Sequence, residues 1–136
     1  MTTPAAYARD LDSRRHGPHD DRSTADAAAL AAETIRYLAY ATSHGGLTTP
    51  ATIYAMTGDL SAAAARLPQV LAQITSWLTD QARTGQITDD HRRPARQLTD
   101  DTAAALALAA RHATDLARAL AAAQNLTSTL HPAGPG

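Results

Sequence analysis

Few residues in this 136-residue chain have the type and spacing that catalysis or metal binding requires. Cysteine and lysine are absent, which excludes thiolate nucleophiles, cysteine-ligated metals, Walker-type phosphate loops and Schiff-base chemistry. Glu33 is the single glutamate, so a ferritin-like di-iron bundle is excluded as well. No G-x-S-x-G motif occurs. The sequence therefore predicts no catalytic residue and no cofactor, and we expect a protein that is not an enzyme.

Histidines provide two further candidates for chemistry. His16 and His19, followed by two aspartates, have the spacing of a metal-binding pair, but no second ligand pair accompanies them. We interpret that segment as a solvated tail without a metal. His112 lies on a predicted apolar stripe, one turn before Asp115. A general base needs an activated partner and a pocket, so we expect a half-buried histidine that hydrogen-bonds across helices or to Asp115.

Three arginines, Arg92, Arg93 and Arg96, form the clearest candidate for ligand binding. The helix dipole disfavours cations at the start of a helix, where these arginines are predicted to lie. Together with free backbone N–H groups they could bind a phosphate or another anion. The alternative function is therefore a nucleic-acid or anion-binding accessory protein. Because four aspartates lie between residues 89 and 101, with Asp100 four residues after Arg96, we favour local ion pairs.

Large apolar side chains are scarce, which favours a function in protein association. Alanine supplies 33 residues, whereas Leu, Ile and Val together supply 20, fewer than a self-sufficient core normally contains. Tyrosine and tryptophan suit both bundle boundaries and protein interfaces. We therefore expect a homodimer, or binding to another protein, with Trp77 or Tyr54 near the interface. The candidate interface residues are Tyr54, Leu67, Val70, Trp77, Leu116 and Leu120.

Capping and glycine signals divide the chain into helices. Ser23 or Thr24 is the predicted first N-cap, Thr49 precedes Pro50 at a second helix start, and Gly45 and Gly85 suit helix ends. A break or kink is expected at residues 57–59. The predicted helices cover residues 23–43, 50–56, 59–83 and about 91–130. No segment has the alternating pattern of a strand.

Apolar spacing predicts which faces of the two long helices pack together. In the third helix Pro68 interrupts the apolar stripe, so a kink is expected there. The stripe of this helix comprises Leu60, Ala64, Leu67, Leu71, Ile74 and Leu78, widened by Val70 and Trp77. The stripe of the last helix comprises Leu98, Thr102, Ala105, Ala109, His112, Leu116, Ala119, Ala123, Leu126 and Leu130.

The predicted fold is all-α, an antiparallel bundle of three long helices plus one short helix. Residues 23–131 form the helical bundle domain, after a disordered N-terminal arm over 1–22 and before a flexible tail over 132–136. The net charge of −1 and the lack of a membrane-spanning apolar run favour neither nucleic acid nor membrane. We expect a cytoplasmic, non-catalytic interaction or assembly module.

Composition also suggests a resemblance. The helical-hairpin pattern is similar in size to the small secreted hairpins that carry a W-x-G turn, but here Trp77 precedes Leu78 and Thr79, and no W-x-G occurs. Arginine in place of lysine, abundant alanine and the absence of phenylalanine resemble small, uncharacterised, alanine-rich helical proteins of actinobacteria. This resemblance is one of composition only and implies no activity.

Overall fold

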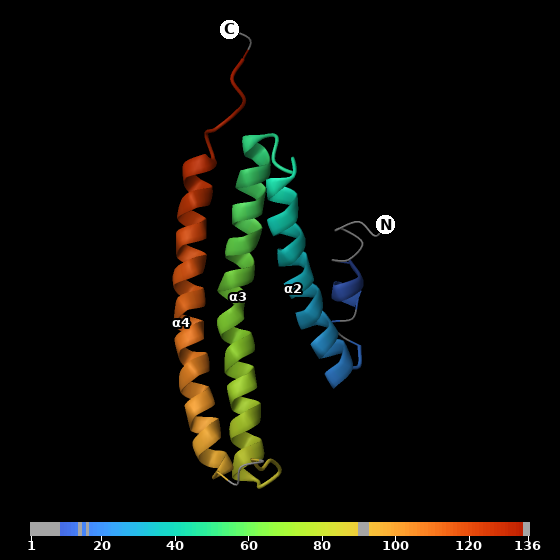
Figure 1. Cartoon of the computed structure of the whole chain (residues 1–136), viewed down its shortest axis with the longest axis vertical. Coiled ribbons are helices and arrows are strands. Elements are labelled where there is room, and N and C mark those ends of the chain that lie inside the picture. Colours follow the sequence, from blue (N-terminus) through green and yellow to red (C-terminus); the bar gives the residue numbers. More distant parts are fainter. Residues whose placement is uncertain (1–8, 14, 16, 90–92, 135–136) are drawn as a thin grey trace. The chain divides into compact units, whose positions relative to one another are not determined.

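The structure is a computed structural model that describes residues 9–13, 15, 17–89 and 93–134 (Figure 1). It is all-α, with three long helices, α2 (Asp21–Ser43), α3 (Pro50–Arg83) and α4 (Ala95–Thr127). A short helical segment covers residues 9–13, and the described residues contain no strand. The predicted all-α class with three long helices is confirmed, and of the predicted bundle the packing of α3 against α4 is seen. The chain divides into two compact units, Met1–Gly46 and Leu47–Gly136, and each is described by itself below.

The short helix predicted over residues 50–56 is wrong. Those residues are the first turns of α3, which continues without a break through residues 57–59 and through Pro68. The Thr57 hydroxyl donates to the Ile53 carbonyl oxygen at 2.8 Å, a bond that lies within the helix and does not compete with it. A glycine at position 58 weakens a helix by only about 1 kcal/mol, which the packing of a long helix overcomes.

In the first unit, helix α2 begins with a capping box rather than at the predicted N-cap. Asp20 is the N-cap, and its carboxylate accepts a hydrogen bond of 2.7 Å from the Ser23 backbone N–H. The Ser23 hydroxyl lies 3.2 Å from the Asp20 backbone N–H and closes the box. Ser23 is therefore the third helical residue. None of the residues of α2 is buried, so this amphipathic helix has no packing partner within its unit.

Glycines end two of the helices, as predicted. After α2, Gly45 has a φ of 85°, and the Gly46 N–H donates to the Ala41 carbonyl oxygen at 2.8 Å. After α3, Gly85 has a φ of 71°, and the Gln86 N–H donates to the Gln81 carbonyl oxygen at 2.9 Å. Both are six-to-one bonds of the Schellman type, which need a residue that tolerates positive φ.

In the second unit, α3 and α4 lie side by side and run in opposite directions (Figure 1). Two contacts fix their register. The Ser61 hydroxyl donates to the Ala117 carbonyl oxygen at 2.8 Å, and the Gln124 side-chain amide donates to the Tyr54 carbonyl oxygen at 3.3 Å. In both pairs the two residue numbers add up to the same sum, as an antiparallel pair of equal rise requires.

The contact between α3 and α4 is made by small side chains. The buried apolar residues of the described chain are Ala64, Ala113 and Ala117, which are 3%, 6% and 8% exposed, and Thr99, nearer the start of α4, is also buried. Small residues let two helix backbones approach closely, and the hydrogen bond from Ser61 to a backbone carbonyl of α4 depends on that approach. The pair is therefore held by close contact over many turns, with little apolar area per residue.

The predicted packing stripe of α4 is wrong by one residue. The buried residues Thr99, Ala113 and Ala117 each follow a residue of the predicted stripe, namely Leu98, His112 and Leu116. Alanine methyls cover both faces of α4, so hydropathy alone does not distinguish the two. The close approach of α3 and α4 distinguishes the two faces, because it requires the smallest side chains at the centre of the contact and leaves the leucines at its edges.

Candidate interaction surface

One side of α3 exposes a row of large apolar side chains, which we name the α3 stripe. It consists of Leu67, Val70, Ile74 and Trp77. Each of these side chains is between 43% and 57% exposed, whereas a buried leucine or tryptophan normally contributes strongly to a core. Neighbours of the stripe on the same helical face, Ala63 and Gln81, are uncharged. The stripe is thus a continuous apolar surface of about three helical turns.

The α3 stripe results from an apolar arc wider than one neighbouring helix covers. Its four residues each precede a half-buried residue on the side of α3 that faces α4, as Leu67 precedes Pro68 and Trp77 precedes Leu78. On α4, Leu116 similarly precedes the buried Ala117 and is 50% exposed. Residues one position before the contact on two antiparallel helices lie on the same side of the pair. Leu116 therefore extends the apolar surface onto α4.

Four of the six predicted interface residues, Leu67, Val70, Trp77 and Leu116, lie together on this side of the pair. The other two do not. Tyr54 is 43% exposed, but it is sixteen residues from Val70, a rotation of about 160° around α3, and so lies on the opposite side. Leu120 is half-buried. Ile74 was expected to pack against a neighbouring helix, and its exposure places it in the stripe instead.

The structure does not support the predicted environment of His112. The residue is exposed, and it has no hydrogen bond to Asp115 or across to α3 in the described part of the chain. Its position one residue before the buried Ala113 places it on the same side of the pair as Leu116, four residues further along α4. His112 is thus a polar residue at the edge of an apolar surface and not a half-buried bridge.

Of the three predicted anion-binding arginines, the two that the structure describes differ in their contacts. Arg92 lies outside the described residues. Arg93 forms a two-point ion pair with Asp89, in which Nε donates to Oδ2 at 3.0 Å and Nη2 to Oδ1 at 3.3 Å. These hydrogen bonds, followed by the charge of Asp89, raise the pKa of Arg93 above its ordinary value. The guanidinium of Arg93 is thus engaged within the chain, as the ion-pair interpretation predicted.

Arg96 departs from the prediction. It is exposed near the start of α4, and the structure contains no ion pair between Arg96 and Asp100, although both residues are described. No acidic residue lies in the first turn of α4, and no side chain caps it. The predicted pair of Arg96 with Asp100 is therefore wrong.

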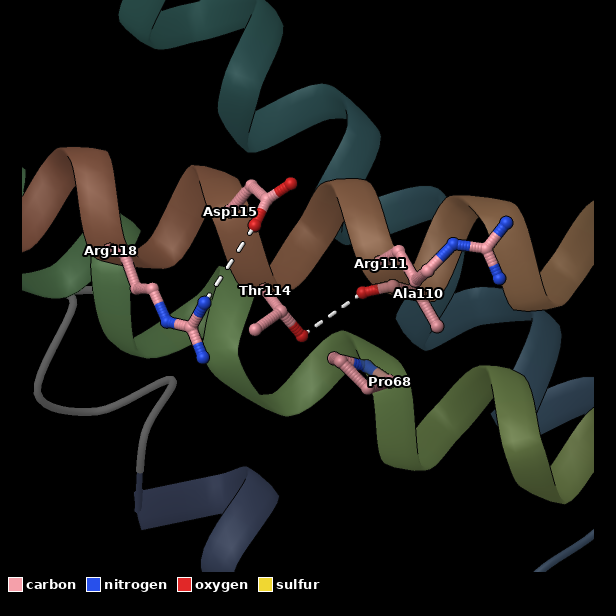
Figure 2. A pocket seen from close by; sticks show the side chains of 6 residues that line it. All are labelled: Pro68, Ala110, Arg111, Thr114, Asp115 and Arg118. Carbon is pink, nitrogen blue, oxygen red and sulfur yellow. Dashed lines mark hydrogen bonds and ion pairs between the residues drawn. The ribbon is translucent and has the colours of Figure 1, made fainter.

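The opposite side of the pair carries a shallow depression of about 380 Å³ (Figure 2). It is lined by Pro68, Ala110, Arg111, Thr114, Asp115 and Arg118. The Thr114 hydroxyl donates to the Ala110 carbonyl oxygen at 3.1 Å, and Arg118 lies 3.9 Å from Asp115 with both side chains largely exposed. Thr114, Asp115 and Arg118 thus bond within α4, and water screens the charges of Asp115 and Arg118.

The remaining histidines do not gather into a metal site in the described residues. His16 lies outside them, and His19 Nε2 lies 2.9 Å from the Arg15 carbonyl oxygen. At the end of α2, the ring of His44 stacks on Tyr40 with centroids 4.0 Å apart. His44 Nδ1 lies 2.8 Å from the Tyr40 carbonyl oxygen, so this nitrogen donates a proton and is not a base for the neighbouring Ser43.

Two findings concern the chain as a whole. In the described part, no helix combines the length and the apolar character needed to cross a membrane. Comparison with protein-family profiles, with curated proteins and with solved structures finds no match to this chain.

Proposed function

We propose that this protein is a non-catalytic helical interaction module that binds a protein partner through the apolar side of the α3·α4 pair. One observation carries the proposal: the α3 stripe exposes four large apolar side chains in a row, without a charged residue among them. A chain with so few large side chains gains stability when it buries them. Leaving a whole row exposed therefore favours a surface that a partner covers.

The chemistry of the stripe matches that of protein interfaces. Interface centres are depleted in charged residues and enriched in aromatic ones, and Trp77 is the only tryptophan of the chain. Ile74, three residues before Trp77, is an aliphatic neighbour that helps to exclude water from the indole ring. The alternative, anion binding by Arg92, Arg93 and Arg96, is less well supported, because Arg93 is already paired with Asp89. We therefore take the stripe as the working surface of the protein.

Photochemical cross-linking in the cells that naturally produce the protein tests the proposal. A photoreactive phenylalanine analogue replaces Ile74, at the centre of the stripe, in the full-length chain. As the matched control the same analogue replaces Ser76, which is exposed on a face of α3 turned away from the stripe. We expect a cross-linked protein complex from position 74, whether with a second copy or with another protein, and none of that complex from position 76.

Helical content measured by circular dichroism confirms that both labelled chains fold. A substitution of Val70→Asp in the chain labelled at position 74 is expected to abolish the complex, because an unpaired charge is costly to bury. Absence of any complex from position 74, or equal labelling from positions 74 and 76, would contradict the proposal.

A further inference from the structure

We infer that the partner of the α3 stripe is a second copy of the same chain, which packs its own stripe against it in the antiparallel direction. This inference rests on the proposed function and names the partner. The two α3·α4 pairs would then form a four-helix assembly with a two-fold axis. Two observations carry it: the spacing of the stripe, and the charges on it and beside it.

The spacing of the stripe is the same in both directions. Its residues follow one another at intervals of three, four and three positions. Two antiparallel copies related by a two-fold axis need such a palindrome, because each residue must meet its counterpart in reverse order. With the axis at the level of residue 72, Val70 lies opposite Ile74 of the partner subunit, and Leu67 lies opposite Trp77 of the partner subunit. Each contact then occurs twice.

The size and charge of the stripe residues suit this pairing. The largest residue, Trp77, is placed opposite a leucine and not opposite another tryptophan, and the two β-branched residues meet near the axis. Alternating large and smaller side chains in this way fills an interface without overlap. No charged residue lies between positions 67 and 79 of α3. The nearest charges, Arg66 and Asp80, lie beside the two ends of the stripe, and in this register Arg66 comes closest to Asp80 of the partner subunit, so that opposite charges meet.

Sedimentation equilibrium of the full-length chain tests self-pairing. We expect the wild-type protein at micromolar concentration to have twice the mass of 14.2 kDa. Val70→Asp and Ile74→Asp are each expected to weaken the dimer at least a hundredfold, because each places a charge near the axis. Ser76→Asp, on a face of α3 turned away from the stripe, is the matched control and is expected to leave the dimer intact. Circular dichroism verifies that every variant keeps its helices.

Disulfide cross-linking tests the register, and the absence of native cysteine keeps the result clear. A mixture of the Val70→Cys and Ile74→Cys chains is expected to form disulfide dimers several-fold faster than either chain alone, because only the mixed pair is directly opposed. Equal rates would overturn the register. A monomeric wild-type chain would overturn self-pairing. If position 74 then still cross-links to a different protein in cells, the proposed interaction function stands; if it cross-links to nothing, both proposals fail.

Discussion

At the scale of single residues, side-chain size decides where α3 and α4 meet. Ala64, Ala113 and Ala117 lie at the contact, and the Ser61 hydroxyl reaches a backbone carbonyl of α4 across it. Larger side chains such as Leu67 and Leu116 lie beside the contact and remain half-exposed. The same residues that keep the helices close thus leave the leucines available to a partner.

Gly58 provides the first prediction at this scale. A Cβ at this position would collide with the side-chain amide of Gln124, which donates to the Tyr54 carbonyl oxygen. Because the colliding atoms end a flexible side chain, Gly58→Ala displaces Gln124 rather than the helix. We expect Gly58→Ala to raise the free energy of unfolding by about 0.5–1 kcal/mol when Gln124 is replaced by alanine, through helix propensity.

In the wild-type background the gain from Gly58→Ala should be smaller, because the hydrogen bond of Gln124 is lost at the same time. Urea unfolding of the two single variants and the double variant measures the difference. The same gain in both backgrounds would show that Gln124 does not occupy the space beside Gly58.

Asp20 provides a prediction of pH dependence. The hydrogen bond from the Ser23 backbone N–H, followed by that from the Ser23 side chain, lowers the pKa of Asp20 below its ordinary value of 3.8. A carboxyl group whose pKa is lower in the folded state stabilises the fold above its unfolded pKa, and this contribution is lost as the pH falls through the folded value. We expect the helicity of α2 to decrease below about pH 4.

Circular dichroism between pH 7 and pH 2 measures this loss. Asp20→Asn keeps an N-cap acceptor but carries no charge, so its helicity should change less over the same range. Identical acid transitions in the wild type and in Asp20→Asn would assign the loss to other groups.

At the scale of elements, α3 contains a proline within a long helix. Pro68 cannot donate to the Ala64 carbonyl oxygen, yet the helix continues on both sides of it. We expect Pro68→Ala to leave the free energy of unfolding unchanged or to raise it, because the missing backbone hydrogen bond is restored. Urea unfolding measures the effect. A loss of more than about 1 kcal/mol would show that the place of the proline ring in the depression that it lines with Ala110 and Thr114 matters more than the restored bond.

Element ends were predictable from the sequence where local chemistry determines them. Gly45 and Gly85 mark the ends of α2 and α3 because few other residues adopt positive φ without strain. Pro50 marks the start of α3 because its ring fixes φ near the helical value and the first turn needs no N–H from it, and Thr49 before it is the N-cap residue. The N-cap of α2 was misplaced because Asp20, Ser23 and Thr24 can all cap a helix, and the choice depends on how the preceding chain enters it.

Helix faces were harder to predict, because they depend on contacts between elements. On α4 the predicted stripe lies one residue before the true contact, as Leu116 lies before the buried Ala117. A hydropathy pattern records which residues avoid water but not how closely two backbones approach. The exposure of Leu67, Val70 and Trp77 followed from the scarcity of large side chains, whereas the position of Tyr54 on the opposite side depended on the direction in which α4 packs.

At the scale of the whole molecule, association and stability should be linked. If a second copy binds the folded chain and not the unfolded one, the melting temperature rises with protein concentration. We expect the melting temperature, followed by circular dichroism, to fall when the wild-type protein is diluted a hundredfold within the micromolar range. Val70→Asp should start at the lower temperature and change little on dilution. A wild-type melting temperature that is independent of concentration would contradict self-association.

The alanine contact between α3 and α4 also has a calorimetric consequence. The heat capacity of unfolding rises with the apolar area that becomes exposed, and for ordinary domains it is about 12–15 cal/mol/K per residue. Because Ala64, Ala113 and Ala117 are the buried apolar residues of the described chain, a single copy should have a smaller value and hence a flatter stability curve. Withdrawing four large side chains per copy from water would raise that value, so the curvature of the stability curve depends on whether the chain is alone.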